Sequence, residues 1–402
     1  MTDTIGWIVF VIFIGTICRV SAKVLLNMTE SESQLFCDLI MYSGTGIDAA
    51  DAIQNCIDQN VSDLMLPPGL YTLSKGLLIP YSIKISSSVV SSPCSLDDAS
   101  LCPILQASTN FYSTVGIVTT TSKLANVWID HLVIDGNRIN RLQSVAAADC
   151  AGDVNNRDGG RNLFFNNCEN CKFTNSISAN ALCASGFVWT GAKGVISNNT
   201  VVDNGDHLTQ MMWADGLTCL ICDGATISGN TFIGNTDIDL IVGSGTGALI
   251  HNNFFYHEVN DLNRSVFSAL MFDNFNGGTS GNFDGCKVTS NTISCNPTAD
   301  MCCFGIQLGP HPWYASEPIA GNYFEVSGNE INGAGVGINS DAAGNDVYPV
   351  TLMDNVITDT REKFTCGALC GTSRSGSEFN YSPDSRVEYH NNEPTSFTTY
   401  KC

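Results

Sequence analysis

Six short stretches of this sequence share one pattern: an apolar residue, two small or polar residues, and an asparagine. They are Ile196-Ser-Asn-Asn199, Ile227-Ser-Gly-Asn230, Ile250-His-Asn-Asn253, Val288-Thr-Ser-Asn291, Val326-Ser-Gly-Asn329 and Leu352-Met-Asp-Asn355. Successive asparagines are 31, 23, 38, 38 and 26 residues apart. The shortest spacing is 23 residues, and the others exceed it by irregular amounts. This is typical of a solenoid whose coils share a core and carry loops of different lengths. A propeller blade needs about 40 residues, so the shortest step excludes a propeller.

The segment before the repeats predicts a short helix followed by strands. Residues 48–58 place Ala49, Ile53, Cys56 and Ile57 on one face, and Asp48 can cap the helix. The stretch from Leu64 to Leu73, with Pro-Pro-Gly at its centre, then predicts a strand, a turn and a second strand. One amphipathic helix ahead of many short strands indicates a cap on an elongated stack.

This opening resembles a known family. Gly46 to Tyr71 contains Gly-x-Asp-x-x-Asp-Ala-Ile-Gln-x-x-Ile-Asp and then Leu-Pro-Pro-Gly-x-Tyr, as at the start of pectate-lyase-like proteins of the pectin-lyase-like superfamily. The stretch from Val127 to Thr360 resembles that superfamily's coils, in which stacked asparagines bridge neighbouring turns. The resemblance implies an all-β fold over residues 23–360, a single-stranded right-handed parallel β-helix with an N-terminal capping helix. The superfamily contains lyases, hydrolases, epimerases, viral spikes and non-enzymes, so it implies a fold rather than an activity.

The N-terminus predicts export. Ile5 to Ile17 is an apolar run shorter than the about 20 residues that span a bilayer, and Val20-Ser21-Ala22 offers small residues for a signal peptidase. Residues 1–22 are therefore predicted to be a signal peptide of a secreted, extracellular or cell-surface protein with no membrane attachment after cleavage. Asp3, with no Lys or Arg before the run, leaves an uncleaved membrane anchor as the alternative. The predicted N-glycosylation sites are Asn27, Asn60, Asn198, Asn263 and Asn380.

The chain has 18 cysteines, which indicates an oxidising compartment. Loss of Cys18 with the signal peptide leaves an odd number, so one thiol is free or links two chains, and a disulfide-linked or otherwise assembled oligomer is an expectation. The pairs Cys168-x-x-Cys171 and Cys219-x-x-Cys222 have the spacing of zinc ligands. In or beside a strand, however, an offset of three points side chains to opposite faces, so disulfides or buried thiols are expected and no metal site is predicted there.

The last segment, residues 361–402, lacks the coil pattern and contains Cys366, Cys370 and Cys402. It is expected to be an irregular tail, attached by a disulfide to the end of the solenoid and shielding open strand edges.

The charge balance limits the partners of the protein. Asp and Glu total 39 and Lys and Arg total 18, so the formal net charge is −21. Such an acidic surface repels phosphate backbones, which excludes nucleic acid as a partner. A polyanionic ligand would need a bridging cation or a local basic patch.

Three carboxylates form the candidate catalytic group. Aligning each coil back from its asparagine places Asp215–Cys219 and Asp237–Ile241 on neighbouring strands of one parallel sheet, about 4.8 Å apart. If Ile238, Leu240 and Val242 face inward, Asp237 and Asp239 share the outer face, with Asp215 one coil back. Carboxylates this close either share a proton, which raises one pKa for general-acid work, or hold a cation such as Ca²⁺.

Neighbouring loops supply further candidates. The loop 204–213 is expected to bring His207 to the carboxylates as an acid or base and Trp213 as a platform for a sugar ring. Arg264, Gln307 and His311 are the predicted substrate-binding residues, and Arg264 is also the base that a calcium-dependent lyase would need. Tyr256, His257 and Trp313 complete the loop candidates.

Asn235-Thr236-Asp237 is similar to the Asn-Thr-Asp of polygalacturonase-type hydrolases, which implies a catalytic Asp237. That family also has an Asp-Asp pair, a Gly-His-Gly and an Arg-Ile-Lys further along the chain, and none of them follows Asp237 here. The departure makes membership of that hydrolase family improbable.

Two functions remain open. The first is a secreted polysaccharide-active enzyme, of glycoside hydrolase or polysaccharide lyase type, that cleaves or epimerises glycosidic units on the sheet face. The second is a non-catalytic cell-surface or extracellular structural glycoprotein. In both cases the expected partner is a polysaccharide or another glycan.

Overall fold

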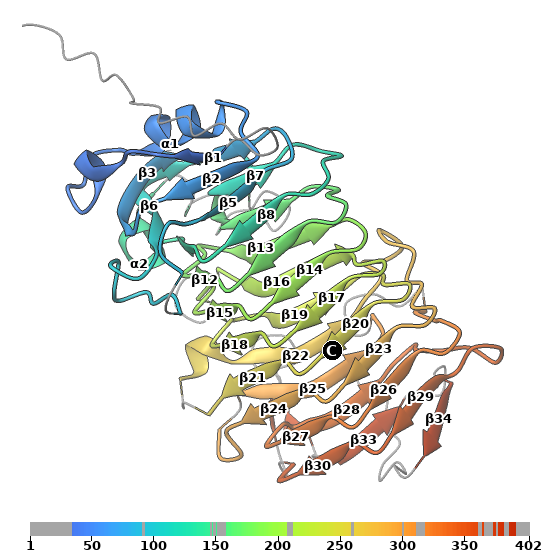
Figure 1. Cartoon of the computed structure of the whole chain (residues 1–402). Coiled ribbons are helices and arrows are strands. Elements are labelled where there is room, and N and C mark those ends of the chain that lie inside the picture. The colour runs from blue at the N-terminus through green and yellow to red at the C-terminus, as the bar shows by residue number, and fades with distance from the viewer. Residues whose placement is uncertain are drawn as a thin grey trace, which may run out of the picture.

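The computed structural model describes residues 34–90, 93–144, 147, 150, 158–206, 212–258, 261–299, 301–310, 318–360, 364–365, 373–374, 377–381 and 386–390. The chain winds into an elongated stack of coils, with helix α1 at one end and strand β34 at the other (Figure 1). Each complete coil contributes one strand to each of three sheets, here called A, B and C, and neighbouring strands run parallel. This arrangement confirms the predicted parallel β-helix. The signal peptide predicted at residues 1–22 lies outside the described residues.

Within the described residues, sheet A has 12 strands and sheets B and C have 10 each. Sheet A contains β1 (Gln34–Phe36), β2 (Asp63–Leu66), β5 (Lys84–Ser87), β8 (Trp128–Asp130), β11 (Lys172–Thr174), β14 (Val195–Ser197), β17 (Thr226–Ser228), β20 (Leu249–His251), β23 (Lys287–Thr289), β26 (Glu325–Ser327), β29 (Val350–Met353) and β34 (Val387–His390). Sheet B contains β3 (Gly69–Lys75), β6 (Pro103–Tyr112), β9 (Val133–Asp135), β12 (Ile177–Ala179), β15 (Thr200–Val202), β18 (Thr231–Ile233), β21 (Phe254–His257), β24 (Thr292–Cys295), β27 (Glu330–Asn332) and β30 (Val356–Thr358). Sheet C contains β4 (Leu77–Ile79), β7 (Val118–Thr120), β10 (Leu163–Phe165), β13 (Ala184–Thr190), β16 (Ala214–Ile221), β19 (Ile238–Val242), β22 (Val266–Phe272), β25 (Cys302–Leu308), β28 (Val336–Ser340) and β33 (Ser377–Tyr381).

The core is the inside of the coils, and it forms one continuous apolar cluster from Leu35 to Phe379. Many strands are three residues long and bury only the central side chain, as β14 does with Ile196. Each coil has three strands joined at three corners, and the side chains at equivalent positions of successive coils stack in columns. Aromatic residues deepen the stacking, for example Phe232 on Phe255 with ring centroids 4.9 Å apart.

Helix α1 (Ala50–Ile57) covers the N-terminal end of the stack, as predicted (Figure 1). It buries Ile53 and Ile57, and the Asp48 carboxylate accepts a hydrogen bond from the Ala50 N–H at 3.1 Å. The other helices of the described part of the chain are short: α2 (Arg138–Arg141), η1 (Ile40–Tyr42), η2 (Asp158–Gly160) and η3 (Leu262–Arg264).

The turns from sheet A to sheet B, here called the A–B corner, carry the six repeated asparagines. Each lies inside the coil and is at most 5% exposed. The Asn253 Oδ1, for example, accepts hydrogen bonds from the Asn230 N–H and Nδ2, while the Asn253 Nδ2 donates to the Ile227 carbonyl and to Asn291 Oδ1. The same bonds recur from Asn199 to Asn355, which confirms the ladder predicted from the spacing.

The described cysteines follow the disulfide prediction, since six pairs form. Both Cys-x-x-Cys segments are disulfides, Cys168–Cys171 and Cys219–Cys222. The expectation that Cys219 and Cys222 point to opposite faces is wrong, because Cys222 follows the end of β16 and its turn brings both side chains into the core. Cys18, Cys366, Cys370 and Cys402 lie outside the described residues.

The C-terminal segment differs from its prediction. The described part of residues 361–402 contains β33, which pairs with β28, and β34, which pairs with β29, so the coil pattern continues beyond Asn355. A small antiparallel pair, β31 (Phe364–Thr365) with β32 (Ser373–Arg374), lies between them in the sequence. Sequence reasoning missed the continuation because Tyr389-His-Asn-Asn392, which follows the same spacing as Ile250-His-Asn-Asn253, begins with an aromatic residue where the six recognised stretches have Ile, Val or Leu.

Candidate functional site

The turns from sheet B to sheet C, here called the B–C corner, differ in length from coil to coil and gather most of the candidate residues. Sheet C begins there, and register places one residue of each strand in a column: Gly186, Gly216, Asp239, Ala269, Gly305 and Gly337. A Cβ on Gly186 would lie 2.5 Å from the Asn204 Nδ2, and one on Gly216 would lie 2.9 Å from the Asn235 Nδ2. The glycines therefore leave room for asparagine side chains inside this corner, and Asp239 stands out from a column of small residues.

Asp239 is fully buried, so the prediction that its carboxylate lies on the solvent face is wrong. Its Oδ1 accepts a hydrogen bond from the Asn235 Nδ2 at 2.8 Å, and its Oδ2 lies 2.6 Å from the His257 Nε2. His257 is also buried, at the end of β21, and its Nδ1 lies 3.2 Å from the Arg264 carbonyl oxygen. Asp239 and His257 thus form a buried pair that joins two coils.

The error comes from the start of β19, where the register differs by one residue from the predicted alignment and the side chains do not alternate strictly. Leu217 pairs with Leu240 and Cys219 with Val242, so Asp215 is level with Ile238 rather than with Asp237. Ile238 packs with Ile241 and Met271 in a separate apolar cluster, outside the main core. Leu240 and Val242 lie in the main core as predicted, so Asp239 and Leu240 are both interior and side-chain alternation is broken between Ile238 and Leu240.

Asp215 and Asp237 are both half-exposed, in agreement with their predicted accessibility. Asp215 lies at the start of β16, and its Oδ2 accepts a hydrogen bond from the Thr218 Oγ1 at 2.6 Å. That hydroxyl also lies 2.5 Å from the Ser185 Oγ on the preceding strand. Asp237 immediately precedes β19, and its N–H donates to the Ala214 carbonyl at 3.3 Å. The two aspartates therefore lie on neighbouring coils at the same corner.

Asn235 and Thr236, which precede Asp237 in the Asn-Thr-Asp motif, are both fully buried. The Asn235 Oδ1 accepts a hydrogen bond from the Asn204 Nδ2 at 2.7 Å, and the Thr236 Oγ1 accepts one from the Ala214 N–H at 3.1 Å. These contacts give the first two residues of the motif a structural role and leave Asp237 as its accessible member.

Two arginines lie at the same corner among acidic residues. The Arg264 Nη1 lies 2.6 Å from an Asp203 oxygen and its Nε 3.3 Å from an Asp261 oxygen. Arg138 is 8% exposed, and its Nη1 lies 3.5 Å from an Asp206 oxygen. Burial lowers the pKa of Arg138 although Asp206 and Asp203 act to raise it. Burial likewise raises the pKa of Asp203, more than Arg264 and Arg138 lower it.

Gln307 does not occupy the predicted loop. It lies in β25 and is fully buried, where its Nε2 donates to the Gly309 carbonyl and its Oε1 accepts from the Asn339 Nδ2 at 2.6 Å. Trp213 is half-buried directly before β16, and its carbonyl accepts a hydrogen bond from the Ala184 N–H. His207, His311 and Trp313 lie outside the described residues.

The sequons fall in different settings. Asn198 is exposed in the A–B corner, and Asn60 is exposed after α1, where its N–H donates to the Tyr81 hydroxyl. Asn263 lies in η3 and Asn380 in β33, while Asn27 is outside the described residues. Glycosylation at all five stays a prediction.

No group of three or more His, Cys, Asp or Glu side chains is arranged to hold a metal ion in the described part of the chain. Burial of Asp239 removes one of the three carboxylates from which the calcium option was drawn.

Sequence reasoning missed the Asp239–His257 pair, the buried Arg138 and Asp203. The available clue was a pair of glycines, Gly186 and Gly216, each two residues after the start of its strand, β13 or β16. A small residue at an equivalent position in stacked coils makes room for a side chain from the next turn.

No protein-family model and no curated protein matches this sequence. Solved structures match over most of the chain. The tailspike protein of E. coli bacteriophage HK620, in complex with a pentasaccharide, is 10% identical with a TM-score of 0.55, and the match covers 94% of this chain and 68% of the tailspike chain. An exopolygalacturonase from Thermotoga maritima is 9% identical with a TM-score of 0.51, covering 92% of this chain and 94% of the enzyme.

An alginate lyase from Paenibacillus sp. str. FPU-7 is 12% identical with a TM-score of 0.50, covering 85% of this chain and 95% of the lyase. At such low sequence identities, these matches are evidence for the fold alone. Together with the parallel coils and the asparagine ladder, they show that this chain has the pectin-lyase-like right-handed parallel β-helix fold.

Proposed function

We propose that this protein is a polysaccharide-active enzyme that hydrolyses glycosidic bonds with Asp215 and Asp237. The observation that carries the proposal is the contrast among the three candidate carboxylates. Asp215 and Asp237 are half-exposed on neighbouring coils, whereas Asp239 is fully buried. Structural neighbours named as a polygalacturonase and an alginate lyase support the same broad class of substrate.

The proposed step uses one aspartic acid and one aspartate. Asp237 gives its proton to the leaving glycosidic oxygen as that carbon–oxygen bond breaks, and Asp215 takes a proton from the water whose oxygen bonds to the sugar carbon. Thr218 and Ser185 support this assignment, because their hydroxyls form a chain that ends on the Asp215 carboxylate. Inversion requires about 6.5–9.5 Å between the two carboxyl groups, which leaves space for the water.

Arg264 favours hydrolysis over elimination. An arginine that abstracts a proton in a lyase must be free to act as a base. The Arg264 guanidinium instead contacts the carboxylates of Asp203 and Asp261, which makes it their charged partner. We therefore assign Arg264 to positioning the loop after β21 and the turn after β15, and Trp213 to contact with a sugar ring.

The test is a panel of neutral and acidic polysaccharides, assayed separately for new reducing ends and for unsaturated products. We expect new reducing ends without unsaturated products from at least one polysaccharide. Asp215→Asn and Asp237→Asn are each expected to remove this activity without changing the thermal midpoint. Asp346→Asn is the matched control, because the Asp346 side chain is 83% exposed and pairs only at the surface, with Arg386.

Unsaturated products would show that the reaction is an elimination by a lyase and not a hydrolysis. Binding without any turnover would favour the non-catalytic structural glycoprotein. Full activity in both asparagine variants would contradict the site.

Secretion belongs to the same proposal. The six disulfides support an oxidising, extracellular location, as do the apolar run and small residues at the N-terminus. Within the described residues, no helix has the length and apolar character needed to cross a membrane. N-terminal sequencing of the exported protein tests this part, and a mature chain that begins at Lys23 is expected.

A further inference from the structure

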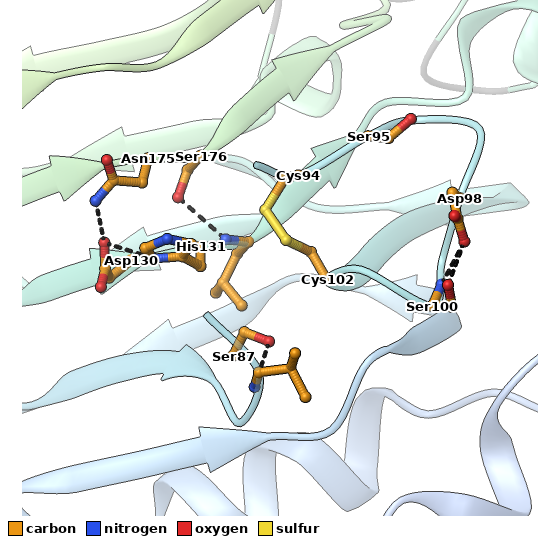
Figure 2. Close-up of a disulfide and its surroundings, with 12 residues drawn as sticks. Ser87, Cys94, Ser95, Asp98, Ser100, Cys102, Asp130, His131, Asn175 and Ser176 are labelled. Atoms are coloured by element: carbon orange, nitrogen blue, oxygen red, sulfur yellow. Dashed lines mark hydrogen bonds and ion pairs between the residues drawn. A yellow bond between two sulfur atoms is a disulfide. The ribbon is translucent and has the colours of Figure 1, made fainter. Parts of the chain in front are cut away.

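A cavity of about 370 Å³ lies on the A–B corner, under the insertion that joins β5 to β6. Most A–B connections are tight turns, but a longer insertion, described at residues 88–90 and 93–102, stands here and contains the Cys94–Cys102 disulfide. Figure 2 shows this disulfide on one side of His131, with Asp130 and Asn175 on the other. The turns of three coils that follow the insertion in the sequence form the floor of the cavity, and the insertion forms its roof.

The roof and one end of the cavity are apolar. Val90, Pro93 and Cys94 come from the insertion, and Ile177 comes from β12. The disulfide holds the insertion in place, so this wall is formed before any ligand arrives. Apolar carbon and sulfur atoms of this kind cover the C–H face of a small ring.

The facing wall is polar. It is formed by His131, Asn175, Ser176, Asn198 and Thr200. His131, Asn175 and Asn198 occupy the same position in successive turns, with φ of 52°, 51° and 56°, so their side chains form one column. Asn198 is exposed at this wall, and the His131 side chain is 17% exposed.

Asp130 fixes the orientation of this wall from beneath. Its Oδ1 accepts hydrogen bonds from the Thr174 Oγ1 at 2.7 Å and the Asn175 Nδ2 at 2.8 Å, and lies 3.1 Å from the His131 Nδ1. Burial raises the pKa of Asp130, but the bonds from Asn175 and Thr174 and the nearby His131 imidazole outweigh burial and hold that pKa below its usual range. The Asn175 amide is directed at Asp130, whereas the His131 Nδ1 lies near Asp130 without a hydrogen bond of good geometry, so the His131 imidazole and the Asn175 Oδ1 are left to contact a ligand.

The charges of the cavity select a neutral ligand. None of its described lining residues is a lysine or arginine, and the protein carries a net charge of −21, so an anion is disfavoured. No described lining residue is acidic either, and the Oδ1 of Asp130 next to His131 already accepts two hydrogen bonds, which a cation would have to displace. One apolar wall opposite a wall of neutral hydrogen-bonding groups matches a polyhydroxylated ring with one C–H face.

We propose that this cavity binds a single neutral pyranose ring. Its volume lies at the lower end of the range for small-molecule sites, which suits one or two sugar rings. The inference is independent of the catalytic proposal, because the cavity lies on the A–B corner and the candidate carboxylates lie on the B–C corner. Failure of either one leaves the other standing.

The experiment follows the imidazole of His131 by NMR. The chain has only 6 histidines, so their ring C–H signals are few, and the signal lost in His131→Asn identifies His131. Asparagine suits the position, since Asn175 and Asn198 adopt the same backbone conformation in the next two turns. Full-length protein made without N-glycosylation is used, because Asn198 lines the cavity and is a sequon.

Wild-type protein is titrated with the methyl glycosides of glucose, galactose and mannose and with N-acetylglucosamine, each up to its solubility. Sodium glucuronate and inorganic phosphate are the charged probes. We expect a saturable shift of the His131 signal with at least one neutral sugar and none with the charged probes. The variants His131→Asn and Thr200→Val are then compared by ligand-observed saturation transfer, and each is expected to weaken binding about tenfold.

Thr231→Val is the matched control for Thr200→Val, because Thr231 is the register partner of Thr200 on the next strand and does not line the cavity. It is expected to bind as the wild type does. The proposal is overturned if no neutral sugar gives a saturable shift, or if glucuronate or phosphate binds as well as the best sugar. It is also overturned if His131→Asn and Thr200→Val both retain wild-type affinity.

Discussion

Two corners of the same coil behave differently. At the A–B corner, one residue type repeats from Asn199 to Asn355, and each side chain makes the same bonds to the next coil. At the B–C corner, the interior holds Asn204 and Asn235 at equivalent positions and then, at other positions, the Asp239–His257 pair, and the connecting loops vary in length. A uniform corner stabilises the fold and leaves little to vary. The irregular corner can carry exposed carboxylates, because its interior is stabilised by buried polar side chains of several kinds.

The largest expected effect on stability concerns His257. Its replacement by leucine removes the partner of a fully buried carboxylate, and loss of one partner of a buried ion pair costs about 3–5 kcal/mol. We therefore expect His257→Leu to lower the free energy of unfolding by that amount in chemical denaturation. His251→Leu is the control, because His251 is only half-buried on the neighbouring sheet and lacks a carboxylate contact of this kind. Equal stability of the two variants would remove the distinction between the corners.

The next effect tests the uniform corner. Asn253→Ala leaves the Asn230 N–H and the Ile227 carbonyl without their hydrogen-bond partner inside the core. An unsatisfied buried polar group costs about 1–3 kcal/mol, so a loss of about 2–4 kcal/mol is expected. The neighbouring Asn252 is outside the ladder at φ 55°, and Asn252→Gly is expected to leave the denaturation midpoint almost unchanged. A ladder that tolerates alanine would show that stacking of apolar side chains alone holds the coils.

Asp273, directly after β22, is a second buried aspartate that can be compared with Asp239. Burial raises the pKa of Asp273 to about 6, against the effect of the Phe275 N–H bonded to it. A folded pKa above the unfolded value of about 3.9 means that this group stabilises the fold below about pH 4 and that the contribution is lost as the pH rises through about 6. Asp273→Asn is therefore expected to raise the stability at pH 7 by about 2–3 kcal/mol and to have little effect near pH 4.

Thermal midpoints of the wild type and of Asp273→Asn between pH 4 and pH 8 check this expectation. The difference between the two proteins should grow between pH 4 and pH 6 and then stay constant. A difference independent of pH would contradict the raised pKa and leave a packing effect as the cause.

The smallest effect compares two glycines in the same coil. Gly328 lies in the A–B corner with φ 60°, and a Cβ there would meet no atom within 4 Å. Gly333 lies in the B–C corner with φ 76°, and a Cβ there would lie 2.1 Å from the Cys295 carbonyl oxygen. Gly328→Asn is expected to change the free energy of unfolding by less than about 1 kcal/mol, since asparagine tolerates this conformation. Gly333→Asn should cost clearly more, and equal costs would contradict the contrast.

The sequence revealed the uniform corner and much less of the irregular one. Six asparagines at one position were enough to predict the ladder, because a single buried contact repeats in every coil. Asp239 was misplaced because strict side-chain alternation was assumed, whereas Asp239 and Leu240 are both buried inside the coil at the start of β19. Gln307 was misplaced because it alternates with the inward Ile306 and Leu308, which predicts accessibility, whereas its side chain is buried and bonded to Gly309 and Asn339. The Asp239–His257 contact joins residues 18 positions apart on different coils, and only the folded chain brings them together.

The central claim is that the accessible Asp237 acts on the substrate while the buried Asp239 stabilises the corner. The most direct test is the initial rate of reducing-end release per mole of folded protein, on one responsive polysaccharide, for Asp237→Asn and Asp239→Asn. We expect Asp237→Asn to lose about 10²–10⁴-fold in rate with an unchanged thermal midpoint. Asp239→Asn should have a lower thermal midpoint and a rate close to wild type once the folded fraction is taken into account. A folded Asp239→Asn that is inactive, beside an Asp237→Asn that retains its rate, would contradict the account.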